Sequence, residues 1–141
     1  MRVLVTGSSG FIGSAIADKL EASGCNVVRT TRKKSKANNI NLIYLDLSKL
    51  ETISKLANHQ RFDVIIHFGA KIGWSNESIE ELFVTNVLAT GLLANLSTTT
   101  DTLLVFSDVL WAIDEAEGKV IDFPDIATVE CMVRVDDTKN I

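Results

Sequence analysis

The chain has 141 residues, 46% of them hydrophobic and 23% charged, which is typical of a single soluble globular domain with a core of its own. Its formal net charge of −4 argues against nucleic acids and anionic membranes as partners, because both favour a basic protein surface. The two cysteines lack metal-ligand or disulfide-framework spacing, and no signal peptide or membrane span is evident, so we expect a cytoplasmic protein without a metal site.

The first hundred residues alternate short apolar runs with helical patterns. The apolar runs predict strands over residues 3–6, 26–31, 41–45, 63–68 and 102–107. Helical spacing predicts helices over residues 11–22, 49–58 (capped by Ser48) and 79–96. The inward face of the last helix is predicted to consist of Leu82, Phe83, Val87, Leu88, Leu92 and Leu96. Elements alternating in this way predict an α/β fold, a doubly wound parallel sheet of the Rossmann type with about five to six strands and helices on both faces.

The last third of the chain departs from this pattern. Residues 108–125 include acidic side chains, Gly118 and the only proline, Pro124, and predict mostly loop. Residues 128–136 alternate weakly and suit a strand. We expect a Rossmann domain over residues 1–112 and a divergent segment over residues 113–141 that forms no separate domain.

A glycine-rich turn lies between the first strand and the first helix, with Gly7, Gly10 and Gly13 at three-residue steps. Such a turn leaves the strand tightly, lets the backbone approach a pyrophosphate and packs the helix closely on the sheet. Free N–H groups and the helix dipole favour phosphates at this end. The turn therefore predicts dinucleotide binding, the alternative being a glycine-rich turn without a ligand. Its predicted binding residues are Gly7, Ser9, Gly10, Phe11, Ile12 and Gly13.

The GxxGxxG spacing resembles the short-chain dehydrogenase/reductase superfamily, and further segments are similar to its extended branch, the NAD-dependent epimerase/dehydratase family. Those segments are Asp46-Leu47, His67-Phe68-Gly69-Ala70, Thr85-Asn86-Val87 and Val105-Phe106-Ser107. The resemblance covers about residues 1–112 and implies a dinucleotide-binding domain there. It implies that Asp46 faces the adenine ring and that Ser107 is the catalytic serine. The further residues that it assigns to the cofactor are Leu47, Phe68, Gly69, Ala70 and Asn86.

Each of these residues also suits a purely structural role. Asp46 is compatible with a turn, Asn86 with a buried polar group and Ser107 with a strand end. The shared order of the segments along the chain favours the family interpretation.

The end of the second strand bears on the choice of cofactor. NAD-preferring Rossmann domains place an acidic residue there to bind the ribose hydroxyls. This sequence has no Asp or Glu between Glu21 and Asp46, and instead carries a basic cluster that includes Arg29 and Arg32. An arginine there suits a 2′-phosphate. We therefore expect NADP, with Arg32 among its ligands, and NAD as the alternative; the cluster is otherwise a solvated basic loop.

Hydride transfer in this superfamily uses a Tyr-x-x-x-Lys pair after the fifth strand. The only tyrosine, Tyr44, precedes the fourth strand, and Val135 stands four residues before Lys139. The sequence thus predicts the NAD(P)-binding domain of an epimerase/dehydratase- or reductase-type relative that is truncated and lacks this pair, which leaves its enzymatic activity and its small-molecule substrate open. The alternatives are a non-catalytic NADP-binding sensor or interaction module, and a domain completed by another chain.

Two more residues and one surface complete these expectations. His67, at the end of the fourth strand, is expected to be structural, the alternative being an acid or base near the nicotinamide. Lys71 is expected to face solvent, the alternative being contact with a substrate. The resemblance also implies that the helix over residues 79–96 takes part in a dimer interface. We therefore expect a homo-oligomer through exposed apolar surface on that helix.

Overall fold

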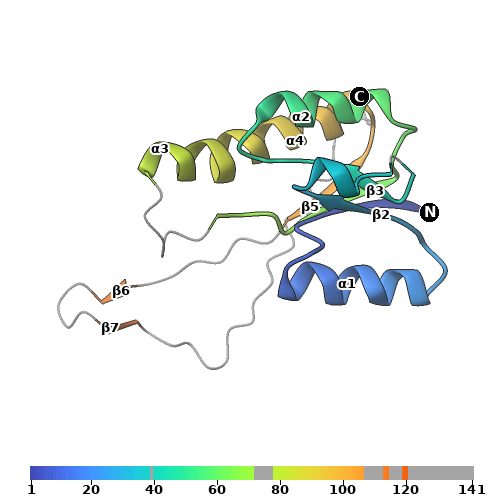
Figure 1. The fold of residues 1–141 in the computed structure, drawn as a ribbon, viewed down its shortest axis with the longest axis horizontal. Helices are drawn as coiled ribbons and strands as arrows, with labels where there is room; N and C mark the ends of the chain where they lie inside the picture. The colour runs from blue at the N-terminus through green and yellow to red at the C-terminus, as the bar shows by residue number, and fades with distance from the viewer. Residues whose placement is uncertain (39, 72–77, 107–112, 115–118, 121–141) are drawn as a thin grey trace, which may run out of the picture.

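The computed structural model describes residues 1–38, 40–71, 78–106, 113–114 and 119–120. One parallel five-stranded sheet forms the centre of the described part, in the order β3-β2-β1-β4-β5 (Figure 1). Its strands are β1 (Arg2–Thr6), β2 (Asn26–Thr31), β3 (Leu42–Tyr44), β4 (Val64–His67) and β5 (Leu103–Phe106). The order reverses between β1 and β4, which is the doubly wound Rossmann arrangement that the sequence predicts.

Helices cover both faces of this sheet (Figure 1). One face carries α1 (Phe11–Ala22). The opposite face carries α2 (Leu50–Ser54) with its 3-10 extension η2 (Lys55–Asn58), and a long helix made of α3 (Ile79–Leu82), the π-helical η3 (Phe83–Leu88) and α4 (Ala89–Thr99). The remaining described elements are a 3-10 turn, η1 (Lys34–Lys36), and an antiparallel pair, β6 (Ile113–Asp114) with β7 (Lys119–Val120). The strand predicted over residues 128–136 lies outside the described residues.

The central strand β1 divides the core into two clusters. Its side chains alternate between the faces, so that Leu4 joins the cluster beneath α2 and α4, whereas Val3 and Val5 join the cluster beneath α1. All three are fully buried. A continuous apolar strand is what a parallel sheet covered on both faces requires.

The predicted cap of the second helix is wrong. Lys49 occupies the N-cap position of α2 and makes no side-chain capping bond. The hydroxyl of Ser48 instead donates to Asp46 Oδ1 at 2.7 Å. Ser48 thus stabilises the turn after β3, and α2 starts without the predicted cap.

The predicted inward face of the long helix is also wrong in part. Phe83, Val87 and Leu88 are 51%, 54% and 40% exposed, respectively. The buried positions are Thr85, Ala89, Leu93 and Ser97, at four-residue intervals. The physical reason is the π-helical turn Phe83–Leu88, which shifts the register of the face.

By length and composition, one helix among the described residues, Ile79–Thr99, could cross a membrane, and 22% of its apolar window is buried. In this fold Ala89 and Leu93 of that helix belong to the core cluster on one face of the sheet. Core helices of globular domains pass the same test, so its hydropathy is weak evidence for a membrane span.

Candidate functional site

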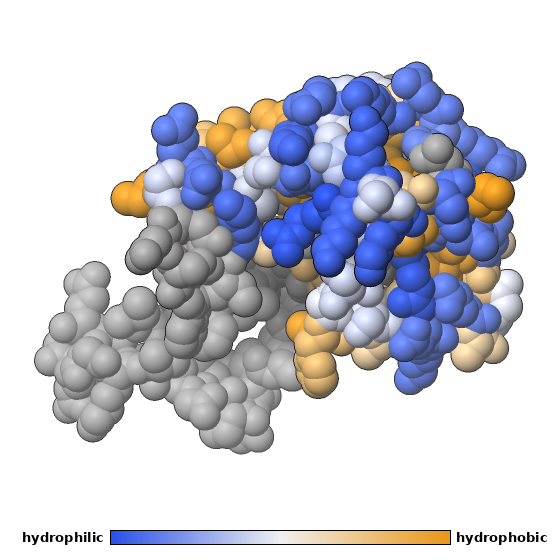
Figure 2. Space-filling view, in the orientation of Figure 1, coloured by the Kyte–Doolittle hydropathy of each residue, from blue (hydrophilic) through white to orange (hydrophobic). Residues whose placement is uncertain are grey.

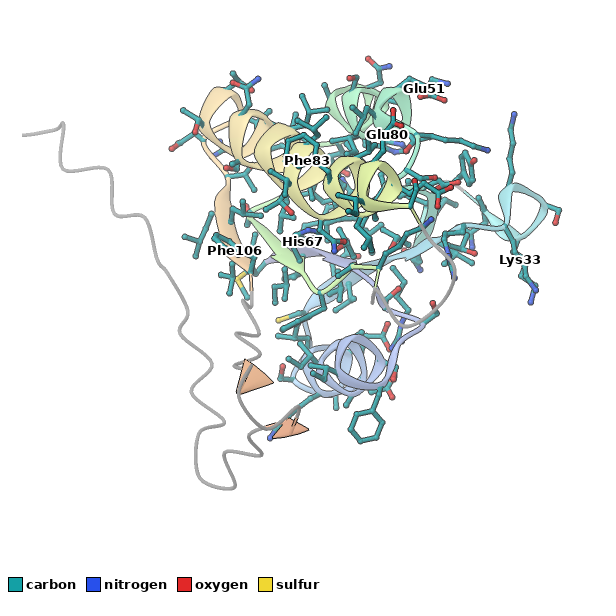
Figure 3. The ribbon with its side chains drawn as sticks, turned by 90° about the vertical axis from the view of Figure 1, so that its left-hand side faces the viewer. Lys33, Glu51, His67, Glu80, Phe83 and Phe106 are labelled. Carbon is teal, nitrogen blue, oxygen red and sulfur yellow. The ribbon has the colours of Figure 1, made fainter. Side chains whose placement is uncertain are left out.

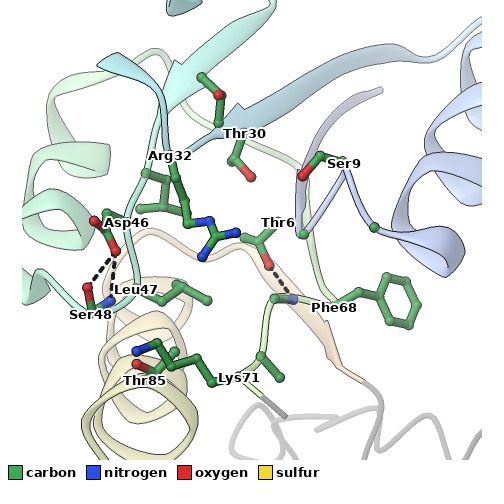
Figure 4. A pocket seen from close by; sticks show the side chains of 16 residues that line it. Thr6, Ser9, Thr30, Arg32, Asp46, Leu47, Ser48, Phe68, Lys71 and Thr85 are labelled. Atoms are coloured by element: carbon green, nitrogen blue, oxygen red, sulfur yellow. Dashed lines mark hydrogen bonds between the residues drawn. The ribbon is translucent and has the colours of Figure 1, made fainter. Parts of the chain in front are cut away.

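A cavity of about 350 Å³ lies where the chain leaves β1, β2, β3 and β4 (Figure 4). In doubly wound sheets this edge, at the reversal of strand order, is where ligands bind. The cavity is lined by Thr6, Gly7, Ser9, Gly10, Thr30, Thr31, Arg32, Leu45, Asp46, Leu47, Ser48, Phe68, Gly69, Ala70, Lys71 and Thr85.

Most of the sequence-predicted binding residues gather at this cavity. Those that line it are Gly7, Ser9, Gly10, Arg32, Asp46, Leu47, Phe68, Gly69 and Ala70. The others, Phe11, Ile12, Gly13 and Asn86, do not line it. Phe11 is 95% exposed at the start of α1. Ser107, the predicted catalytic serine, lies outside the described residues.

The glycine turn brings three backbone segments into direct contact. Gly7 has a φ of +66°, and a Cβ there would lie 2.6 Å from the carbonyl carbon of Phe68. A Cβ on Gly13 would lie 2.3 Å from the carbonyl oxygen of Gly7. Glycine is therefore required at both positions, by the backbone conformation at Gly7 and by the close approach of α1 at Gly13. Gly13 shapes the site without lining it.

Two arginines of the basic cluster have different surroundings. Arg29 points toward α1, where its Nε donates to Glu21 at 3.0 Å and its guanidinium also pairs with Asp18. The hydrogen bond from Arg29 holds the pKa of Glu21 below its usual range. Arg32, one residue beyond β2, instead reaches into the cavity (Figure 4). Only Arg32 of this pair is placed to meet a ligand there.

Asp46 lines the cavity and also organises its own turn. Its Oδ1 accepts from the backbone N–H and the hydroxyl of Ser48, at 3.2 and 2.7 Å. The Lys49 ammonium lies 3.7 Å from Oδ2. Thr52 donates its hydroxyl to the Asp46 carbonyl oxygen at 2.9 Å. The structural interpretation of Asp46 as a turn residue and its place at the cavity are therefore compatible.

His67 is buried beneath the long helix (Figure 3) and has a partner at each ring nitrogen. Nδ1 lies 2.6 Å from the hydroxyl oxygen of Thr6, and Nε2 lies 3.0 Å from that of Thr90. Burial lowers the pKa of His67 from 6.5 to about 4. The imidazole is therefore neutral at physiological pH, which agrees with the structural role expected for it.

Sequence reasoning missed two residues of the cavity wall. Lys71, expected to face solvent, lines the cavity, and its Nζ lies 3.8 Å from Glu81 Oε2. Thr85 is 4% exposed, and its hydroxyl has no hydrogen-bond partner among the described residues. The motif Thr85-Asn86-Val87 pointed to this place, but the wall is formed by Thr85 and not by Asn86. Asn86 instead binds the backbone of Lys71, accepting from its N–H at 2.8 Å and donating to its carbonyl at 2.9 Å.

The described residues offer no alternative metal centre. No group of three or more His, Cys, Asp or Glu side chains within the described ranges could hold a metal ion. Hydrophilic side chains cover much of the face seen in Figure 2. The site that the lining residues form is a polar cavity beside a glycine turn and the start of α1.

Comparison with known proteins agrees with this geometry. Residues 3–108 match the NAD dependent epimerase/dehydratase family. The chain belongs to this family. It is 31% identical over 101 residues to a sterol-4-alpha-carboxylate 3-dehydrogenase (decarboxylating) of Dictyostelium discoideum, an alignment covering 67% of this chain and 30% of that protein. It is likewise 31% identical over 107 residues to a UDP-glucose 4-epimerase of Pisum sativum, covering 63% of this chain and 31% of that protein.

Solved structures of other proteins show the same fold. The Thermus thermophilus UDP-glucose 4-epimerase in complex with NAD superposes with a TM-score of 0.67 at 28% identity, over 88% of this chain and 43% of that one. A short-chain dehydrogenase/reductase of Burkholderia multivorans with bound NADP gives a TM-score of 0.62 at 20% identity, over 76% of this chain and 58% of that one. The chain spans about three tenths of the length of the two curated relatives named above. The part of the family that it represents is the NAD(P)-binding domain.

The contact between Gly13 and Gly7 predicts a strong effect of one methyl group. Gly13→Ala should lower the free energy of unfolding by about 1–3 kcal/mol, because the added Cβ meets backbone that cannot rotate away. Gly91→Ala is the matched control: this helical glycine has no atom within 4 Å of a Cβ, so alanine should add about 0.5–1 kcal/mol. Urea unfolding of both variants checks the pair, and equal effects would contradict the assigned contact.

The buried neutral imidazole of His67 predicts acid sensitivity. The unfolded chain takes up this proton near pH 6.5 and the folded chain only near pH 4. Stability should therefore be complete above pH 6.5 and fall between pH 6.5 and 4, by roughly 3 kcal/mol at most.

Urea unfolding across this pH range measures the effect of His67. The slope of stability against pH should become shallower in His67→Gln, whereas His59→Gln should keep the slope of the wild-type protein. Equal slopes for the wild-type protein and His67→Gln would rule out a protonation linked to folding at this residue.

Proposed function

We propose that residues 1–112 form a domain that binds NADP in preference to NAD, and that residues 113–141 form no separate domain. The observation that carries this proposal is the position of Arg32 in the cavity wall, just after β2, with no carboxylate beside it on that strand. In NAD-preferring Rossmann domains an acidic residue occupies this place. A guanidinium there instead suits the 2′-phosphate of NADP.

The described residues fit a dinucleotide in three independent ways. The turn from Gly7 to Gly10 leaves the backbone bare at the start of α1, where N–H groups and the helix dipole favour a pyrophosphate. Lys71 adds a second cation to the wall. The unpaired hydroxyl of Thr85 is a buried polar group that a polar ligand atom would satisfy.

Charge in the cavity favours an anionic ligand although the chain as a whole is acidic. Arg32 and Lys71 line it, and Asp46 is the one carboxylate among its lining residues. That carboxylate already accepts two hydrogen bonds from Ser48 and lies near the Lys49 ammonium. Its negative charge is therefore partly compensated within its own turn, as the charge of Lys71 is by Glu81. Arg32 has no carboxylate partner within 4 Å among the described residues, and its charge sets the local potential.

We propose that the remaining binding residues act through the shape of the cavity and through backbone groups. Leu47, Phe68, Gly69 and Ala70 line the cavity with small or apolar residues. Phe11, Ile12 and Gly13 supply the backbone N–H groups at the first turn of α1, and Asn86 acts through the backbone of Lys71. The bound cofactor would supply hydride chemistry, with Ser107 as the proposed catalytic serine.

The chain's own residues favour binding over turnover. Tyr44 lies in β3 and does not line the cavity, and it is the only tyrosine of the sequence. A missing general acid or base typically costs about 10²–10⁴ in rate. We therefore propose an NADP-binding domain that needs a tyrosine from outside this sequence for efficient hydride transfer to a small-molecule substrate.

A paired titration with NADPH and NADH tests the proposed preference. We expect micromolar binding of NADPH and weaker binding of NADH. Arg32→Gln should weaken NADPH by about 10- to 100-fold, the equivalent of one charge-assisted hydrogen bond, and leave NADH nearly unchanged. Fluorescence or calorimetry measures both affinities.

The matched control is Arg29→Gln, three residues away, because Arg29 is paired with Glu21 and Asp18 outside the cavity. It should keep the wild-type ratio of the two affinities. Tighter NADH than NADPH binding by the wild-type protein would reverse the proposed preference, and no binding of either would refute the proposed function.

We also propose that this domain self-associates through the long helix. Ile79, Phe83 and Val87 are 87%, 51% and 54% exposed and follow one another at four-residue intervals, which places them along one side. Sedimentation at several concentrations should show a mass that rises with concentration. Phe83→Asp should abolish the rise, whereas Ile40→Asp, at another exposed apolar residue, should not. A monomer at every concentration would refute the proposal.

A further inference from the structure

Side-chain hydrogen bonds link the end of β1, the exit of β4 and the long helix into one circuit. At one end, the Gly69 N–H donates to the Thr6 hydroxyl oxygen at 3.2 Å, and that oxygen lies 2.6 Å from His67 Nδ1. At the other end, His67 Nε2 lies 3.0 Å from the Thr90 hydroxyl oxygen, which lies 2.7 Å from the Asn86 carbonyl oxygen. The imidazole is the only group that both ends of this circuit share.

The partners fix the direction of each bond. A carbonyl oxygen can only accept, so the Thr90 hydroxyl donates its proton to Asn86. The Thr90 oxygen is then an acceptor toward the ring, and His67 Nε2 must carry a hydrogen. In the neutral ring Nδ1 is bare, and it accepts the proton of the Thr6 hydroxyl, whose oxygen receives the Gly69 N–H. Each donor in the circuit thus meets one acceptor.

The circuit holds a stretch of chain that lies beyond the backbone pairing of β1 with β4. β1 and β4 end their pairing at Thr6 and His67, and beyond that register the residues that line the cavity depend on other contacts. Phe68 donates its N–H to the Thr6 carbonyl at 3.3 Å. The Gly69 N–H donates to the Thr6 side chain, and the Asn86 amide binds both the backbone N–H and the carbonyl oxygen of Lys71.

We propose that His67, as the neutral Nε2–H tautomer, is a positioning residue that holds residues 68–71 as the floor of the cavity. It does so by coupling the two anchors of that floor, the Thr6 hydroxyl and the helix turn that carries Asn86. This inference rests on the proposed dinucleotide site. His67 itself does not line the cavity, so it acts through Gly69 and Lys71.

Positioning of this kind has a signature that differs from that of Arg32. In the proposed site Arg32, and not residues 68–71, binds the 2′-phosphate, so loosening the floor should weaken both dinucleotides by the same factor. Loss of one neutral hydrogen bond from the circuit corresponds to roughly 3- to 10-fold in affinity. The ratio of NADPH to NADH affinity should stay constant.

The variants that test the circuit are Thr90→Val and Thr90→Ser. Valine keeps the shape of threonine but removes both the acceptor for His67 and the donor to Asn86, whereas serine keeps both. Thr98→Val is the matched control, because the exposed Thr98 makes the same bond to a carbonyl four residues earlier, at 3.1 Å from Ala94, without contacting a histidine. Thermal melting identifies any variant that fails to fold.

The first readout needs no ligand. The nitrogen-15 resonances of His67 in the wild-type protein should show a protonated Nε2 and a bare Nδ1. Amide hydrogen exchange at Gly69 and Lys71 should be slow in the wild-type protein, Thr90→Ser and Thr98→Val, and faster in Thr90→Val. A bare Nε2, or unchanged exchange in Thr90→Val, would overturn the inference.

The second readout is the affinity of each folded protein for NADPH and NADH. Thr90→Val should weaken both by the same factor, roughly 3- to 10-fold, and Thr90→Ser and Thr98→Val should match the wild-type protein. Unchanged affinities in Thr90→Val would overturn the inference. If the wild-type protein binds neither dinucleotide, the proposed function fails, and the tautomer and the exchange rates still decide whether His67 holds the floor.

Discussion

The site depends on a contact between backbones that side chains would prevent. The end of β1, the first turn of α1 and the exit of β4 meet at Gly7, with 2.6 Å between the place of its absent Cβ and the Phe68 carbonyl carbon. The close approach of Gly13 to the Gly7 carbonyl brings α1 against Gly7 as well. Two of these segments, the ends of β1 and β4, also form the wall of the cavity. The same glycine contacts therefore hold the fold together and set the shape of the cavity.

The charge of the cavity depends on which of two nearby arginines faces it. The sequence places Arg29 and Arg32 three residues apart in an acidic chain, and the fold assigns them opposite surroundings. Arg29 lies within β2 and is neutralised by two carboxylates of α1, whereas Arg32 lies just past the strand end and faces the cavity. A difference of three positions along the chain thus separates a stabilising surface ion pair from a candidate phosphate ligand.

Local periodicity was sufficient to predict most of the sheet and its helices. The bounds of α1 and β2 agree with the prediction to the residue, because a twelve-residue amphipathic run and a β-branched run are signals that neighbouring residues carry themselves. The glycine turn was equally visible, since glycine is required by the local backbone. These local signals predict most of the residues that line the cavity.

What the sequence did not reveal depends on contacts between distant residues. The π-helical turn Phe83–Leu88 rotates Thr85 into the wall and leaves Asn86 on the backbone of Lys71. No periodic pattern in the sequence indicates such a turn, so the predicted inward face is wrong at Phe83, Val87 and Leu88. Ser48 was misassigned because a serine before a helix suits both a cap and a turn, and only the position of Asp46 decides between them. Ser107 lies outside the described residues.

The place of β1 at the centre of the sheet has a consequence for the newly made chain. β1 leaves the ribosome before both of its neighbours, and one of them, β4, follows about sixty residues later, with Thr6 paired to His67. Until β4 has been synthesised, one edge of a strand whose middle is the apolar run Val3, Leu4 and Val5 has no partner. An unpaired apolar edge invites pairing with other chains. Because β1 lies at the centre of the sheet, its pairing can be completed only after a long-range contact with β4 has formed.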